Sequence, residues 1–134
     1  RRAEPSQRDR SNHHGRRDQS ELLLYRAAFL EGEADRLLVE QVCQHGRPLR
    51  ELATMQGVAP KLIERHYNAL IRHLKEPAYS YLTVNAALLR PEVRRTAQAR
   101  YFGRRTLRQT AKHLGLSLHE VRKHITIVQA LAKA

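Results

Sequence analysis

The side chains best suited to chemistry gather near the C-terminus, where hydroxyl, imidazole and cationic groups recur along one predicted helix. Arg122 and Lys123 can donate to guanine O6 and N7, or to a backbone phosphate. The neighbouring polar residues fall at spacings that keep them off the apolar positions of that helix. The set that this pattern predicts to contact DNA is Ser117, His119, Arg122, Lys123 and Thr126.

Three further arginines stand at the entrance of the preceding helix, at Arg104, Arg105 and Arg108. Arginines placed before a reading helix typically contact phosphates and set its register on the duplex. For each arginine alone, a solvated surface role is the alternative, so the prediction rests on the cluster. His124 falls next to the apolar stripe of its helix, and we expect it to pack inward.

The sequence offers little to an enzyme. It has no Gly-rich phosphate loop, no His-Glu-x-x-His motif and no paired carboxylates in apolar surroundings. The eight histidines are scattered, and the single Cys43 excludes an internal disulfide and a Cys-based zinc site. We therefore expect no catalysis, no metal and no cofactor. A DNA-binding piece of a recombinase or of a terminase small subunit is left open.

Charge is the strongest global feature of the chain. The 134 residues carry a formal net charge of +12, with an isoelectric point near 10.8. Residues 90–134 hold 11 Lys and Arg against 2 Asp and Glu, whereas residues 21–44 are acidic. Such a field favours a polyanion, nucleic acid before an anionic membrane. No run of 18 apolar residues or secretory signal core is present, so we expect no membrane partner and a cytoplasmic, nucleoid-associated protein.

Residues 107–125 read as two short helices joined by a tight turn. Thr106 with Gln109, and Ser117 with Glu120, both fit the capping box, in which a hydroxyl accepts from the first turn and the Gln or Glu reaches back. Glu120 has a second role open to it, accepting from cytosine N4, and capping is the favoured one. Gly115 stands where the first helix must end in a left-handed residue.

Small and apolar residues show which faces of these two helices pack inward. Ala111, four residues before the glycine, allows the helices to cross closely, and the apolar positions of both helices recur at helical spacing. Those positions are Leu107, Ala111 and Leu114 in the first helix, and Val121, Ile125 and Val128 in the second. This layout is typical of a helix-turn-helix that enters the DNA major groove, with an ordinary helical hairpin as the alternative.

A second copy of the pattern lies upstream, at one constant offset in residue number and without a gap. The matching pairs are Arg47/Arg105, Leu49/Leu107, Arg50/Arg108, Ala53/Ala111, Gly57/Gly115 and His66/His124. Pro48 and Pro60 fall at expected first-turn positions, and Gln56 departs from the second copy's Leu114. The DNA-contacting set predicted for this copy is Arg47, Arg50, Lys61, Arg65 and Asn68. The chain is therefore expected to be a tandem repeat.

The expected fold is all-α, with two three-helix units. Residues 1–19 have almost no apolar side chain and are predicted to be a disordered basic arm. Residues 20–76 hold an apolar helix and the first unit, and residues 91–134 hold the second. Residues 77–90 are predicted to connect them as a helix or a partly extended linker. The apolar stretches 22–30 and 78–89 are suited to docking a partner or to self-association, which makes an interaction adaptor the second hypothesis.

The stretch Ala99–Ile125, with Arg100-Tyr101-Phe102-Gly103 ahead of the first helix, resembles region 4 of the bacterial sigma-70 family. It is similar, more loosely, to the DNA-binding domain of LuxR-type regulators. The resemblance implies a transcription factor that reads double-stranded DNA in the major groove and has RNA polymerase as a further partner. Two features depart from the sigma pattern: Arg108-Gln109 replaces the usual acidic pair, and no region 2 is recognisable upstream.

Overall fold

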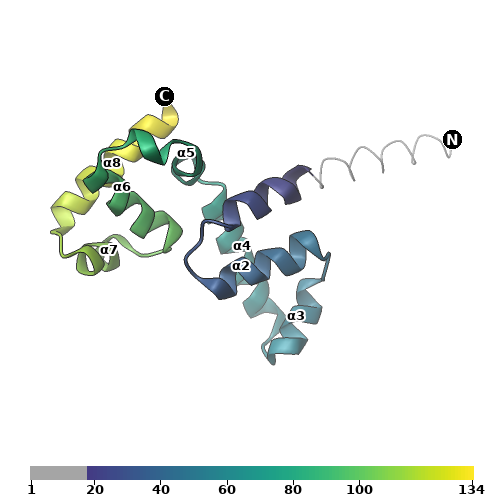
Figure 1. The fold of residues 1–134 in the computed structure, drawn as a ribbon. Coiled ribbons are helices and arrows are strands. Elements are labelled where there is room, and N and C mark those ends of the chain that lie inside the picture. The colour runs from purple at the N-terminus through teal and green to yellow at the C-terminus, as the bar shows by residue number, and fades with distance from the viewer. Residues whose placement is uncertain (1–17) are drawn as a thin grey trace.

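All regular structure in the described part of the chain, residues 18–134 of this computed structural model, is helical (Figure 1). The arm predicted for residues 1–19 lies mostly outside the described residues. Its last two residues were assigned wrongly, because residues 18–27 form a helix. That helix ends before Phe29 and Leu30, which sit in a turn leading to the next helix.

Helices follow one another with short connections. They are α2 (Glu33–Val39), α3 (Leu49–Gln56), α4 (Pro60–Leu74), α5 (Pro77–Asn85), α6 (Pro91–Ala97), α7 (Leu107–Leu114) and α8 (Leu118–Lys133). Two π-helical turns, η1 (Glu40–Gln44) and η3 (Gln98–Phe102), extend α2 and α6, and a 3-10 turn, η2 (Ala86–Leu88), extends α5. Residues 78–88 are thus helical, and the backbone becomes extended at Leu89.

The helix bounds repeat with the same offset that relates Gly57 to Gly115 in the sequence. The elements α2, η1, α3 and α4 begin at the positions that match the first residues of α6, η3, α7 and α8 respectively. Left-handed backbone recurs with them, at Gly46 and Arg104 and at Gly57 and Gly115. We call residues 18–75 the first half and residues 76–134 the second half. Figure 1 shows α2–α4 on one side of the molecule and α5–α8 on the other.

Both predicted capping boxes are present in the second half. The backbone N–H of Gln109 donates to Thr106 Oγ1 and that of Glu120 to Ser117 Oγ, both at 3.1 Å, and each N3 side chain accepts from its cap residue. Helices α2, α3 and α4 of the first half have no side-chain cap. There Pro60 opens α4 at a first-turn position as expected, whereas Pro48 is the residue before α3 and not within its first turn.

The two halves share one hydrophobic core. The predicted stripe of α8, which is Val121, Ile125 and Val128, is buried in it, together with Ile63, Leu70 and Leu74 of α4. Tyr67 of α4 is only partly buried.

Only Lys75 and Glu76 separate α4 from α5, and the halves meet in a dense contact that we call the junction. The His73 Nε2–H donates to the Tyr101 carbonyl oxygen at 2.6 Å, and the Tyr79 hydroxyl donates to the Arg26 carbonyl oxygen at 2.6 Å. The rings of Phe29 and Phe102 lie 5.3 Å apart, centroid to centroid. Buried polar groups that are all paired in this way fix one relative placement of the two halves.

Candidate nucleic-acid interface

The outer face of α8 carries the polar residues predicted from its sequence. Val121 and Ile125 are buried against the core, so the positions between them face outward. All five predicted residues are exposed: Ser117, His119, Arg122, Lys123 and Thr126. The Ser117 hydroxyl also caps the helix, which leaves it only part of its bonding capacity for a ligand.

The cations at this face are unpaired. Among the residues that the structure describes, Arg122, Lys123 and the exposed Arg108 of α7 form no ion pair. Lys112, also exposed on α7, has none either and was not singled out from the sequence. An unpaired cation keeps its full charge for a ligand, so this face can attract phosphates.

Arg104 and Arg105 are placed differently from the sequence prediction. Arg104 Nη1 lies 3.0 Å from Asp35 Oδ2, and the Arg105 guanidinium reaches both Glu31 carboxylate oxygens at 3.0 and 3.2 Å. Both guanidinium groups therefore hold the second half to the acidic segment of the first half, residues 21–44. They could not be recognised as junction residues from their position before a helix, because their partners are 69 and 74 residues away.

Asp35 is the centre of this acidic contact. Burial alone would raise the pKa of its carboxyl, but hydrogen bonds from His66 and Arg104, together with their charges, lower it below its ordinary value of 3.8. The carboxylate is thus ionised at neutral pH and holds two donors at once, His66 Nε2 at 2.8 Å and Arg104 Nη1 at 3.0 Å. The left-handed backbone of Arg104 (φ 53°) is held in place by the same contact.

Two residues of α8 near its outer face have structural roles. His124 packs inward as predicted, with Nδ1 hydrogen-bonded to the buried Thr96 hydroxyl at 2.8 Å. The Glu120 carboxylate accepts from the Ser117 backbone and hydroxyl, which is the capping role favoured from the sequence. Neither side chain is free to read a base in this structure.

The first half presents a different surface at the matching positions. Lys61, Arg65 and Asn68 are exposed on α4, and Arg50 is exposed on α3. Arg47 is engaged in an ion pair with Glu51 at 3.0 Å.

Apolar side chains dominate around the turn between α3 and α4. Met55 is 66% exposed, and Val58 and Leu62 are also exposed beside a hollow of about 230 Å³ that Ile63 and His66 help to line. In the second half, the positions of Met55 and Leu62 hold His113 and Glu120. The turn of the first half is therefore suited to an apolar contact more than to phosphate.

A hollow of about 280 Å³ adjoins the outer face of α8. Arg122 and Thr126 line it from α8, and Arg100 lines it from η3. Arg100 donates to the Arg105 carbonyl oxygen at 2.8 Å and lies 5.3 Å from the centre of the Tyr101 ring. The sequence did not mark Arg100 as a contact residue, because η3 comes before the helix pair and only the folded chain brings it to α8.

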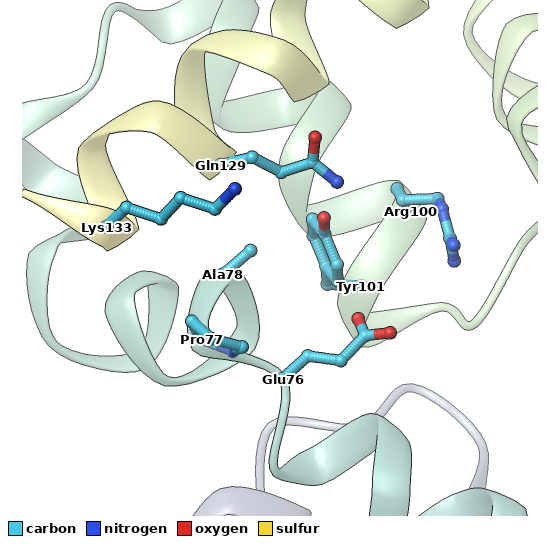
Figure 2. A pocket seen from close by; sticks show the side chains of 7 residues that line it. All are labelled: Glu76, Pro77, Ala78, Arg100, Tyr101, Gln129 and Lys133. Carbon is cyan, nitrogen blue, oxygen red and sulfur yellow. The ribbon is translucent and has the colours of Figure 1, made fainter.

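Figure 2 shows a neighbouring pocket of about 310 Å³ between α5, η3 and the end of α8. Lys133 and Glu76 stand on either side of it, with the Tyr101 ring between Gln129 and Glu76 in this view. Burial raises the pKa of the Tyr101 hydroxyl, so it stays protonated at neutral pH. The lining includes no Ser, Thr, Cys or His.

No group of three or more His, Cys, Asp and Glu within residues 18–134 is placed to hold a metal ion. In the same part of the chain, no helix has both the length and the apolar character needed to cross a bilayer. Comparisons with models of known protein families, with curated proteins and with solved structures find no match to this chain. The likeness to sigma region 4 remains a prediction from the residues alone.

Proposed function

We propose that the chain binds double-stranded DNA and that α8 reads the major groove, as a bacterial or phage transcription regulator or a sigma-like factor would. The observation that carries the proposal is the pair Arg122 and Lys123, exposed and unpaired on the outer face of a capped helix whose other face is core. A helix fixed in this way can present donors to base edges without losing its packing. Such a role places the protein with the nucleoid.

Cations around α8 are suited to contact the sugar-phosphate backbone. Arg108 and Lys112 project from α7, and Arg100 borders the hollow beside Arg122. Contacts of this kind position a reading helix and supply much of the affinity, which makes binding dependent on salt. Each phosphate contact should add about 0.9 to the slope of log affinity against log salt concentration.

The junction gives the proposal a second element. Because α4 and α8 belong to halves that share a core, one chain would present two helices at a fixed separation. A tandem of this kind would read an extended site, with α8 supplying most of the contacts. Lys61, Arg65 and Asn68 of α4 would supply the remainder, weakened by the apolar turn ahead of them.

The test is the double substitution Arg122→Ala and Lys123→Ala, measured by fluorescence anisotropy on a duplex selected from a random pool. Loss of one bidentate base contact alone costs about 1–3 kcal/mol, so affinity should fall at least about 5-fold and the salt slope should become shallower. A matched control, Arg72→Ala with Lys75→Ala, removes the same charge from exposed positions at the far end of α4. It should have a clearly smaller effect.

Equal losses in both variants would reduce the proposal to a general attraction between a basic chain and a polyanion. An unchanged affinity for the α8 variant, with unaltered circular dichroism, would refute it.

A protein-interaction adaptor is the second candidate, favoured by one specific surface. Met55, Val58 and Leu62 are exposed together at the turn of the first half, where the second half has polar groups. The resemblance to sigma region 4 would make RNA polymerase the partner. Leu62→Lys should then abolish binding to purified core polymerase and leave duplex binding unchanged.

A further inference from the structure

A groove of about 480 Å³ runs along the second half between η2, α6 and α8. Leu89, Val93, Ile127 and Leu131 form its apolar part, and Arg90, Glu92, Lys123 and His124 line the rest. Leu88 stands at its rim and is 77% exposed, the largest exposed fraction of any bulky apolar side chain in the described residues. An open hollow of this kind marks an interaction site more often than a solvated surface.

The internal repeat shows what this groove corresponds to. At the offset that relates the two halves, Leu89, Val93 and Leu131 match Glu31, Asp35 and His73. In the first half these three residues contact the second half, through Arg105, Arg104 and the Tyr101 carbonyl oxygen. The groove is therefore the second half's version of the junction face, left uncovered within the chain.

The chemistry of the face has changed between the halves. Two carboxylates and an imidazole in the first half are replaced by Leu, Val and Leu in the second. A segment that offers arginines, as residues 101–105 do at the junction, would find no carboxylate at those positions. A partner that fits the groove would present a ridge of apolar side chains, with acidic groups beside it that face Arg90 and Lys123. Glu92 also lines the groove.

The chain carries such a ridge on the helix at residues 18–27. Leu22 is 47% exposed and Tyr25 is 50% exposed, three positions apart and so on one face, and the exposed Glu21 lies next to them. Half of Tyr25 stays exposed although its hydroxyl donates to the Thr83 carbonyl oxygen at 3.5 Å and its ring packs edge-on against Phe29 at 5.4 Å. Another exposed apolar group, around Val58 and Leu62, borders a hollow and does not offer a ridge.

We propose that the groove of one chain receives the helix at residues 18–27 of a second copy, with Leu22 and Tyr25 inserted beside Leu88 and Leu131 and Glu21 facing Arg90 or Lys123. Apolar fit and opposite charge act together in this contact. The proposal does not depend on DNA binding. Lys123 borders both the groove and the proposed DNA-contacting face of α8, whereas the two residues substituted below, Leu22 and Leu88, are not on that face.

Complementation between two variants tests the contact. Leu22→Arg removes the ridge and keeps the groove, whereas Leu88→Arg damages the groove and keeps the ridge. Sedimentation velocity of the full chain over a concentration series should show self-association for the wild type. Each variant alone should have the mass of a monomer, and an equimolar mixture of the two should form a one-to-one complex. The control Leu37→Arg places the same charge at another apolar position that is 47% exposed, and it should associate as the wild type does.

The proposal would be overturned by a wild type that stays monomeric up to about 0.5 mM. At that concentration all but the weakest specific contacts are formed. The proposal would also be overturned by association that survives both single substitutions, or by a mixture that stays monomeric although each variant retains the helical circular dichroism of the wild type.

Discussion

The substitution His73→Leu places at the junction the residue that the second half has at the matching position. It tests what the hydrogen bond and the burial of this imidazole contribute to stability. His73 is 9% exposed, donates to the Tyr101 carbonyl oxygen at 2.6 Å, and lies with its ring centre 5.4 Å from that of Tyr79. The Tyr101 carbonyl is among the last of its helix, where no backbone N–H of the helix follows to bond it. His73→Leu keeps the volume and removes the donor.

The expected cost at pH 7.5 follows from the carbonyl that is left. A buried acceptor without a partner costs about 1–3 kcal/mol, so the free energy of unfolding should fall by that amount. Urea denaturation followed by circular dichroism at 25 °C measures it. His113→Leu, which replaces an exposed imidazole of α7, is the matched control and should change the free energy of unfolding by less than about 0.5 kcal/mol.

The pH dependence gives a second and sharper readout. Burial lowers the pKa of His73 below its ordinary value of 6.5, although the hydrogen bond to Tyr101 acts in the other direction. Between the lowered pKa and 6.5, the unfolded chain binds a proton at this position and the folded chain does not. Wild-type stability should therefore decline as the pH falls below 6.5, by up to about 1.4 kcal/mol per pH unit for this group.

His73→Leu lacks this decline, so the gap between wild type and variant should narrow as the pH falls from 7.5 to 5.5. A gap that is constant over this range would show that His73 is free to take up a proton in the folded chain. A gap at pH 7.5 no larger than that of the exposed control would show that water satisfies the Tyr101 carbonyl equally well. Either result would refute the description of the junction as a dense contact in which the imidazole of His73 is buried and paired.

Two further substitutions test local features of the fold. Ser117→Ala removes the cap of α8 and should lower the free energy of unfolding by about 1 kcal/mol, seen as a melting temperature lower by a few degrees; no change would mean that Glu120 alone caps the helix. Asp35→Asn weakens the contacts to Arg104 and His66 and should cost about 1 kcal/mol at neutral pH. Because the pKa of Asp35 is lowered in the fold, its stabilisation is present above pH 3.8 and is lost as the pH falls through the folded value, so the urea midpoints of variant and wild type should converge at acid pH.

The sequence predicted those parts of the fold that depend on a few adjacent residues. Both capping boxes, the left-handed Gly115 and the buried stripe of α8 could be predicted, because each depends only on residues within one or two turns of helix. The offset between the halves could be found from Ala53 and Gly57 for the same reason: their backbone environment permits few other residues.

The junction could not be predicted in this way. Arg104 and Arg105 have the type and position of phosphate-binding residues, and only the fold shows that Asp35 and Glu31 reach them. Residues 78–89 were expected to dock a partner or to self-associate, but the apolar run does not say which side chains stay exposed, and only the fold shows that Leu88 does.

A comparison of the two halves distinguishes residues that the backbone conformation requires from residues that a partner would require. Gly57 and Gly115 have nearly the same backbone angles, so the turn is shared between the halves as geometry. At the start of the long helix, however, Ala59 and Leu62 stand where the second half has Ser117 and Glu120. A polar cap on one copy and exposed apolar side chains on the other are different surfaces on the same scaffold. We propose that the two surfaces serve two partners, with DNA bound by the half that carries the net positive charge.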